Sequence, residues 1–200
     1  MDMMNSYKQT ITITKLQHDA KNVDIKDKSD HISYPVFLEY FRKLKKITKS
    51  DLIIGINFAY GWMPTMFKFK NDKLNRIVEL LNKARNGAAV LSLEELKMMK
   101  SCLNNSIVGS SKLLHFVNPE LYPIWDSRVY DYLTEKKSYP NECNRCNFYF
   151  DFINFCRDIT KDAKKFASIK SLIESKVGYK ITAIRAAELI MYHNGEIPKK

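Results

Sequence analysis

The chain has 200 residues and a mass of 23.4 kDa, a length that a single hydrophobic core can serve. Its composition is 45% hydrophobic and 12% aromatic with only 6 Gly and 6 Pro, which excludes a disordered, collagen-like or low-complexity protein. There are 33 Lys and Arg against 22 Asp and Glu, which gives a formal net charge of +11 and a pI of about 9.4. This balance predicts attraction to a polyanion, above all DNA, although a lysine-rich solvated surface alone would give the same count.

No stretch of the chain approaches the roughly 20 apolar residues that a membrane-spanning helix needs, so we expect no membrane partner. The segment 1–15 also lacks the apolar core of a secretion signal. Four cysteines in a chain without such a signal indicate a reducing compartment. We therefore expect a cytoplasmic protein, and we expect it to act as a monomer.

Residues 1–33 differ in pattern from the rest of the chain. Polar and β-branched residues alternate from Thr10 to Thr14, which predicts one short strand, and a charged stretch follows over 19–30. We expect this segment to be an N-terminal arm. From Tyr34 the apolar residues recur with a helical period, and the opposite side of this helix carries basic residues from Arg42 to Lys46.

The remainder of the chain, 34–200, predicts a single helical domain. Apolar residues at helical spacing, capping residues such as Ser92 with Glu95, and stops such as Asn194-Gly195 mark the successive elements. The predicted helices after the first one are 52–60, 72–86, 92–104, 110–117, 127–135, 144–158 and 182–193. Together they predict an all-α fold, an orthogonal bundle of about eight or nine helices with short connections.

The most informative segment is 108–129, with the sequence VGSSKLLHFVNPELYPIWDSRV. It begins with a turn at Gly109, continues with a short helix that has Lys112 in its first turn, and reaches Asp126 at the start of the next helix after a proline-bounded loop. This layout resembles the core of the helix-hairpin-helix DNA glycosylase superfamily. In that family a glycine-rich hairpin grips the DNA backbone, and an aspartate in a Pro-Val-Asp context at the head of the next helix supports cleavage of the base–sugar bond.

The resemblance implies a helix-hairpin-helix-like element in this chain and a catalytic role for Asp126. It also implies that Lys112 corresponds to the lysine of the bifunctional family members. The expected DNA backbone contacts are Gly109, Ser110, Ser111 and Arg128. For Arg128 the alternative is an ion pair with Asp126. The cysteines do not match the family's iron–sulfur loop, so we expect no cofactor.

An aspartate suits the implied reaction because breaking an N-glycosidic bond builds positive charge on the sugar, and a fixed carboxylate stabilises that charge. The N–H groups at the head of a helix favour the charged form of Asp126. The alternative is that Asp126 only caps its helix. Lys112 is either an amine nucleophile, a phosphate contact or a plain surface residue.

A base that is excised must first leave the duplex and enter a pocket with aromatic faces and polar groups. The aromatic candidates near the two proline-broken loops are Tyr60, Trp62, His115, Tyr122 and Trp125. Asn57 and Asn118 are the candidates for reading the edge of the base. Packing in the hydrophobic core is the alternative for each aromatic residue, and Asn118 alternatively caps the end of its helix.

The cysteines offer a second kind of site. Cys143 and Cys146 form a Cys-x-x-Cys pair, and Cys102 and Cys156 are the candidate partners in a zinc site. A redox pair is another alternative. Because a second Cys-x-x-Cys is missing and the four histidines show no ligand spacing, we expect unliganded thiols and no metal.

Taken together, the charge and the 108–129 segment favour a DNA glycosylase-like enzyme. Such an enzyme flips a damaged or modified base and cleaves its N-glycosidic bond, in DNA repair or in defence against phage DNA with modified bases. The first alternative is a non-catalytic helical DNA-binding module. A protein–protein adaptor with an incidental basic surface is the second alternative.

Overall fold

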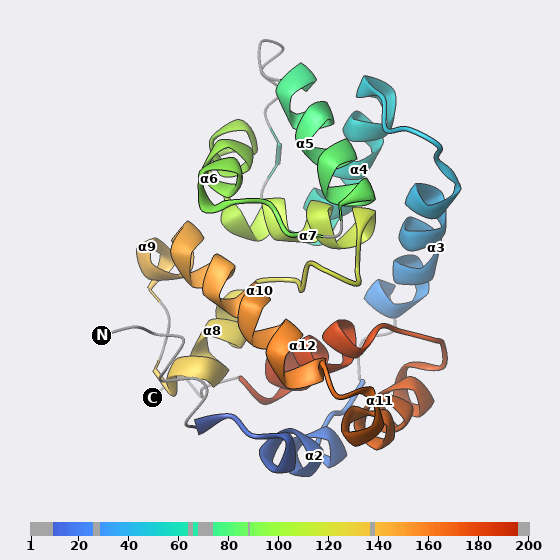
Figure 1. Cartoon of the computed structure of the whole chain (residues 1–200), viewed down its shortest axis with the longest axis vertical. Coiled ribbons are helices and arrows are strands. Elements are labelled where there is room, and N and C mark those ends of the chain that lie inside the picture. The colour runs from blue at the N-terminus through green and yellow to red at the C-terminus, as the bar shows by residue number, and fades with distance from the viewer. Residues whose placement is uncertain are drawn as a thin grey trace. The chain divides into compact units, whose positions relative to one another are not determined.

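The computed structural model describes residues 10–25, 29–63, 66–67, 74–87, 89–136 and 139–195, without the side chains of residues 29, 30 and 140. Within these ranges it contains eleven helices and no strand, which confirms the all-α class (Figure 1). None of the described helices combines the length and the apolar character that crossing a membrane requires. The orthogonal arrangement of the helices stays a prediction.

Two compact units make up the chain. The middle unit is Asp27–Tyr122, and the terminal unit combines Met1–Lys26 with Pro123–Lys200. The single helical domain expected over 34–200 stays a prediction, because compactness within each unit does not test whether the units fold separately.

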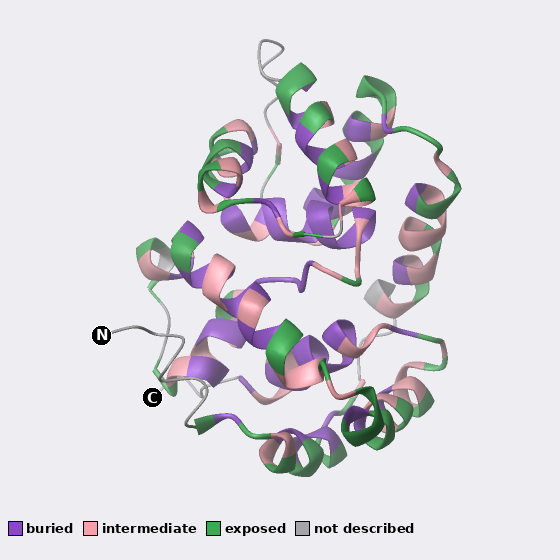
Figure 2. Ribbon diagram, viewed as in Figure 1, coloured by how far each residue is buried: buried purple, intermediate pink, exposed green. Residues whose placement is uncertain are grey.

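The middle unit is built around one buried helix, α7. The helices of this unit are α3 (Ser29–Lys43), α4 (Lys49–Gly61), α5 (Leu74–Asn86), α6 (Leu93–Cys102) and α7 (Ile107–Val117). Each of the other four packs against α7, which is buried along almost its whole length, as the purple ribbon in Figure 2 shows. Most side chains of α7 are apolar, which favours burial, and its buried polar side chains all form hydrogen bonds.

Close packing between α4 and α7 depends on two glycines. A Cβ on Gly109 would lie 2.8 Å from the hydroxyl oxygen of Tyr60, and a Cβ on Gly55 would collide with Phe41 and Leu113. Real side chains do not approach one another this closely. The missing side chains therefore let the two helix backbones come together.

The terminal unit has the same plan around α12. Its helices are α2 (Ile13–Lys21), α8 (Ser127–Thr134), α9 (Pro140–Cys143), α10 (Cys146–Thr160), α11 (Ala163–Val177) and α12 (Ala183–Asn194). Helix α12 packs against α2, α8, α10 and α11, and the run from Ile184 to Met191 is buried on all sides. The Thr182 hydroxyl caps its first turn by accepting a hydrogen bond from the Arg185 backbone N–H.

The strand predicted from Thr10 to Thr14 is wrong. Thr12 is the N-cap of α2, and its hydroxyl accepts a hydrogen bond from the Lys15 N–H at 3.1 Å. Leu16 and Ala20 are fully buried on this helix, which packs against α11 and α12. Burial of this apolar side overrides the weak β preference of the threonine and isoleucine residues.

Helix α11 was not predicted either, because the predicted helices 144–158 and 182–193 leave this segment unassigned. Its buried residues Phe166, Ile169 and Ile173 follow helical spacing, and Asp162 caps its first turn. These two features are the sequence signal for the helix.

Candidate functional site

Asp126 is the N-cap of α8, as the sequence predicted, and it is half-buried. Its Oδ1 atom accepts hydrogen bonds from the Arg128 backbone N–H at 3.1 Å and from the Ser127 hydroxyl at 3.3 Å. Within the described part of the chain, Oδ2 accepts no hydrogen bond and the carboxylate forms no ion pair. One oxygen therefore holds the helix cap while the other is available for another partner.

Asp162, the N-cap of α11 in the same unit, provides a comparison. Its Oδ1 accepts a hydrogen bond from the Lys165 backbone N–H at 3.1 Å, and the Lys165 ammonium lies 3.2 Å from Oδ2. These interactions with Lys165 lower the pKa of Asp162. Both oxygens of Asp162 are thus occupied, whereas only one oxygen of Asp126 is.

Arg128 follows Asp126 on α8 and is held against α12. Its guanidinium carbon lies 5.0 Å from the centre of the Tyr192 ring, in a cation–π contact. A Cβ on Gly195 would collide with the Arg128 carbonyl oxygen, so the end of α12 passes close to the first turn of α8. The start of α8 is therefore fixed by packing from α12.

Lys112 is buried, so the expectation of a plain surface lysine is wrong. Its side chain is only 7% exposed, and its ammonium donates a hydrogen bond to the Trp62 carbonyl oxygen at 2.8 Å. Trp62 is the C-cap of α4, where the carbonyl groups and the helix dipole favour a positive charge. The middle unit thus holds an amine in its interior, bound to the end of a helix.

The turn predicted at Gly109 is also wrong. Helix α7 begins at Ile107, so Gly109 lies within its first turn, where its N–H donates to the Ser106 hydroxyl at 3.0 Å. Ser110 and Ser111 are fully buried, and their hydroxyls donate to backbone carbonyls of the same helix or its cap. These three residues do not present the free backbone N–H groups that a phosphate would need.

Trp125 belongs to the hydrophobic core of the terminal unit. Its side chain is fully buried, and the indole N–H donates to the Cys143 carbonyl oxygen at 2.7 Å. Its ring packs against Phe152, with 5.1 Å between the centroids, and against Tyr130 at 6.1 Å. A ring that is enclosed and hydrogen-bonded in this way cannot stack on a base without a rearrangement of the unit.

Tyr122 and His115 are buried in the core of the middle unit. The Tyr122 hydroxyl accepts a hydrogen bond from the Leu91 N–H at 2.9 Å. Nδ1 of His115 lies 2.7 Å from the Tyr122 carbonyl oxygen, and Nε2 lies 2.7 Å from the Tyr34 hydroxyl. Because a carbonyl oxygen only accepts, Nδ1 donates to it, and in the neutral ring Nε2 accepts from Tyr34. His115 therefore joins α7 to α3 and to the segment after α7.

Tyr60 is likewise a core residue. Its hydroxyl donates to the Leu103 carbonyl oxygen at 2.9 Å, and burial raises the pKa of Tyr60 to about 12. Among the five predicted aromatic residues, only Trp62 is half-exposed. Its indole N–H donates to the Ser33 hydroxyl at 3.1 Å, and its ring lies against Phe116 at 5.2 Å. The other four are buried, so they do not offer an exposed ring face to a base.

The two asparagines have structural hydrogen bonds. Asn57 is exposed on α4, and its amide donates to the Ile53 carbonyl one turn earlier. Asn118 follows α7, where its backbone N–H donates to Leu114 and its side chain donates to the Ala84 carbonyl at 2.9 Å. Asn118 therefore caps the end of its helix, which was the alternative to reading a base.

The four cysteines are free thiols in this structure. Burial raises the pKa of Cys143 to about 12, and the neighbouring Asp126 and Asp131 carboxylates add to the effect. A thiol with such a pKa is a poor nucleophile near neutral pH. The described residues contain no group of three or more His, Cys, Asp or Glu side chains placed to hold a metal ion.

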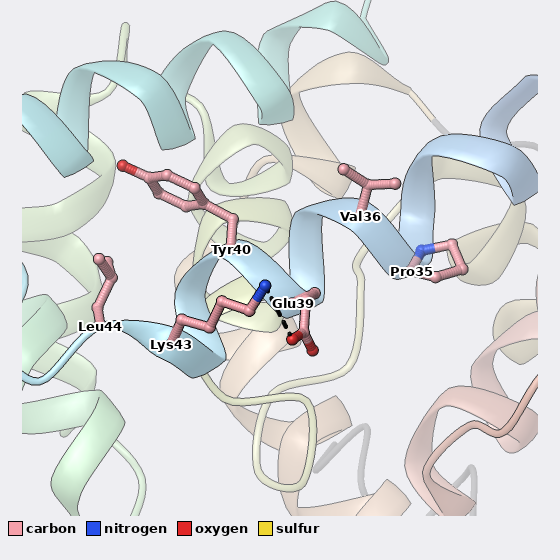
Figure 3. Close-up of a pocket in the computed structure, with 6 residues that line it drawn as sticks. All are labelled: Pro35, Val36, Glu39, Tyr40, Lys43 and Leu44. Atoms are coloured by element: carbon pink, nitrogen blue, oxygen red, sulfur yellow. Dashed lines mark ion pairs between the residues drawn. The ribbon is translucent and has the colours of Figure 1, made fainter.

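An open groove of about 730 Å³ runs along α3, and the sequence did not predict it. The described residues that line it are Pro35, Val36, Glu39, Tyr40, Lys43 and Leu44. Figure 3 shows the ion pair between Glu39 and Lys43, at 3.3 Å, beside the apolar side chains. Val36 is one of the apolar residues that line the groove, and it is 62% exposed.

Comparisons with known proteins identify no relative of the chain: no family model, no curated protein and no solved structure matches it. The candidate site therefore rests on the residues themselves.

Proposed function

We propose that the protein is a DNA glycosylase-like enzyme that flips a damaged or modified base out of DNA and cleaves its N-glycosidic bond, with Asp126 as the catalytic carboxylate. The observation that carries the proposal is the free Oδ2 of Asp126 at the head of α8. The comparable cap residue Asp162 has both oxygens occupied by Lys165. An unneutralised, half-buried carboxylate is the group that the reaction needs.

In the proposed mechanism the bond between the sugar and the base breaks, and its electron pair leaves with the base. Positive charge develops on the sugar, where the Asp126 carboxylate stabilises it and orients the water that completes hydrolysis. The hydrogen bonds from Ser127 and Arg128 fix the carboxylate before the reaction, so little reorganisation is needed. The segment from α7 to α8 is the proposed counterpart of the helix-hairpin-helix element.

Lys112 has a separate part in this proposal. As an amine nucleophile it would attack the anomeric carbon, displace the base and form a Schiff base with the opened sugar. Its hydrogen bond to the Trp62 carbonyl would first have to break. Borohydride trapping decides the question, because a covalent protein–DNA adduct forms only if the amine attacks.

The test is an abasic-site assay with oligonucleotides that carry a panel of damaged and hypermodified bases. Wild-type protein is expected to release at least one of these bases. Asp126→Asn removes the charge but keeps a good helix cap, so it should lose about 100-fold or more in rate. Asp162→Asn is the matched control and should keep full activity. Full activity of Asp126→Asn, or no abasic sites on any substrate, would overturn the proposal.

The burial of the aromatic residues favours a second candidate, a non-catalytic helical DNA-binding module. Trp125, Tyr122 and His115 are fully buried and hydrogen-bonded, so they serve the core rather than a base pocket. In this case DNA binding would be salt-sensitive and unaffected by Asp126→Asn, and no substrate would yield abasic sites.

A further inference from the structure

Among the described residues of the middle unit, the end of α3, the connection that follows it and the start of α4 carry the densest run of basic residues. We call this surface the basic corner. It consists of Arg42, Lys43, Lys45, Lys46 and Lys49, all of which are exposed. It places five cations within eight residues.

Little negative charge opposes these cations. Arg42 and Lys43 share the single carboxylate of Glu39. No described carboxylate forms an ion pair with any of the remaining three lysines, 45, 46 and 49.

Asp51, on the first turn of α4, is the acidic residue that follows these lysines in the sequence, and its carboxylate belongs to the capping box of the helix. It accepts hydrogen bonds from the Thr48 backbone and hydroxyl groups and from the Tyr40 hydroxyl. Although burial opposes the effect, these hydrogen bonds lower the pKa of Asp51. The basic corner therefore keeps a net positive charge that is directed to solvent.

The backbone of the basic corner is held in place by α5. Ile47 is fully buried, and Asn82 binds both of its backbone groups: the Ile47 N–H donates to Asn82 Oδ1, and Asn82 Nδ2 donates to the Ile47 carbonyl, each at 2.9 Å. Arg85 donates to the Lys45 carbonyl at 2.6 Å and to the Leu44 carbonyl. The connection between α3 and α4, which carries Lys45 and Lys46, is thus held at three residues, Leu44, Lys45 and Ile47.

Because the backbone is held in place, binding of a ligand to these lysines costs less conformational entropy than binding to a flexible loop would. Lysine ammonium groups bind phosphates as point charges and do not distinguish bases. The backbone N–H groups of Thr48 and Asp51 at the start of α4 are occupied by the capping box, so these two groups do not compete for the same anion. The surface suits a regular array of phosphates rather than a single small anion.

We propose that the basic corner is the docking surface for the phosphate backbone of duplex DNA, the polyanion being taken from the proposed function. It would contact phosphates independently of sequence and hold the duplex against the middle unit. Its contribution to binding is electrostatic and is measured by the salt dependence of the affinity.

The experiment compares two triple variants of the full chain. Lys45→Gln/Lys46→Gln/Lys49→Gln removes three charges from the basic corner. The matched control, Lys21→Gln/Lys161→Gln/Lys164→Gln, removes three exposed lysines of the terminal unit that also form no ion pair with described residues. Circular dichroism checks that both variants are folded, and fluorescence anisotropy measures the affinity for a short labelled duplex at several salt concentrations.

Each phosphate contact contributes about 0.9 to the slope of log affinity against log salt concentration. Loss of three contacts should therefore make the slope of the corner variant shallower by about 2.7. Between about 50 and 200 mM salt, the affinity of the wild type should therefore fall on the order of 40-fold more than the affinity of the corner variant. The control variant should keep the wild-type slope.

Three results would overturn the inference: no binding of the duplex by wild type at low salt, an unchanged slope in the corner variant, or an equal change in the control variant. Vesicles of phosphatidylcholine with phosphatidylserine provide a further arm. Loss of vesicle binding in the corner variant with unchanged DNA binding would assign the surface to a lipid instead. Failure of base excision with a changed slope would leave the docking surface standing and remove only the proposed function.

Discussion

Replacement of Trp125 tests whether this residue is part of the core or part of a base-binding pocket. The side chain is fully buried, and its N–H donates to the Cys143 carbonyl. Trp125→Ala deletes a buried aromatic ring, which typically costs about 3–5 kcal/mol of unfolding free energy. At roughly 2–4 °C per kcal/mol for a chain of this size, the melting temperature should fall by about 6–20 °C. Trp125→Phe keeps a ring and leaves the carbonyl without its donor, which should cost about 1–3 kcal/mol.

The assay is thermal and urea denaturation followed by far-ultraviolet circular dichroism. Trp62→Ala is the comparison, because Trp62 is the other tryptophan and is half-exposed, so its loss should cost less than the loss of Trp125. A Trp125→Ala variant that melts within about 2 °C of wild type but has lost base excision or DNA binding would contradict the place of Trp125 in the core. That combination would mean that the ring faces a ligand rather than the core.

Three further predictions concern the close packing at Gly109, the hydrogen bonds from Asn82 to Ile47, and the pH dependence of stability at Asp51. Gly109→Ala should destabilise the protein by about 1–3 kcal/mol in urea denaturation, because the added Cβ has no room. Gly61→Ala should be neutral or stabilising, because no atom lies within 4 Å of the added Cβ. Equal effects of the two substitutions would contradict the close contact at Gly109. Asn82→Ala should cost about 2–3 kcal/mol, since it leaves both backbone groups of Ile47 without their partner, and a loss below about 0.5 kcal/mol would contradict this. Hydrogen bonds lower the pKa of Asp51, against the effect of burial, so its stabilisation should be complete above its ordinary pKa of 3.8 and lost as the pH falls through the lower folded value. The stability difference between wild type and Asp51→Asn should therefore shrink on acidification below about pH 4 and stay constant above about pH 6; growth of the difference at low pH would contradict the sign.

Local patterns in the sequence predicted most helices, because helix periodicity and caps depend on neighbouring residues. Asp126 was placed correctly at the head of α8 for this reason. The start of α7 was misjudged because Gly109 indicated a turn, while the Ser106 hydroxyl caps the helix by accepting from the Gly109 N–H three residues later. A serine three positions before a glycine is a weak signal of a helix N-cap, since glycine more often ends a helix than lies inside one.

Burial of the aromatic residues could not be predicted, because it depends on contacts between distant parts of the chain. The partner of the Trp125 N–H is a carbonyl 18 residues away, and the partner of the Tyr60 hydroxyl is 43 residues away. The hydrogen bonds that hold the backbone of the basic corner are equally distant in sequence, since Asn82 lies 35 residues after Ile47. No local pattern identifies such pairs, whereas the cluster of lysines itself is plain in the sequence.

Base excision by the Asp126→Asn variant is the most direct test of the proposed enzyme. On a substrate that the wild-type protein converts to abasic sites, Asp126→Asn should be slower by about 100-fold or more, while Asp162→Asn should match wild type and both variants should bind DNA equally well. Equal rates for wild type and Asp126→Asn would contradict the role of this carboxylate.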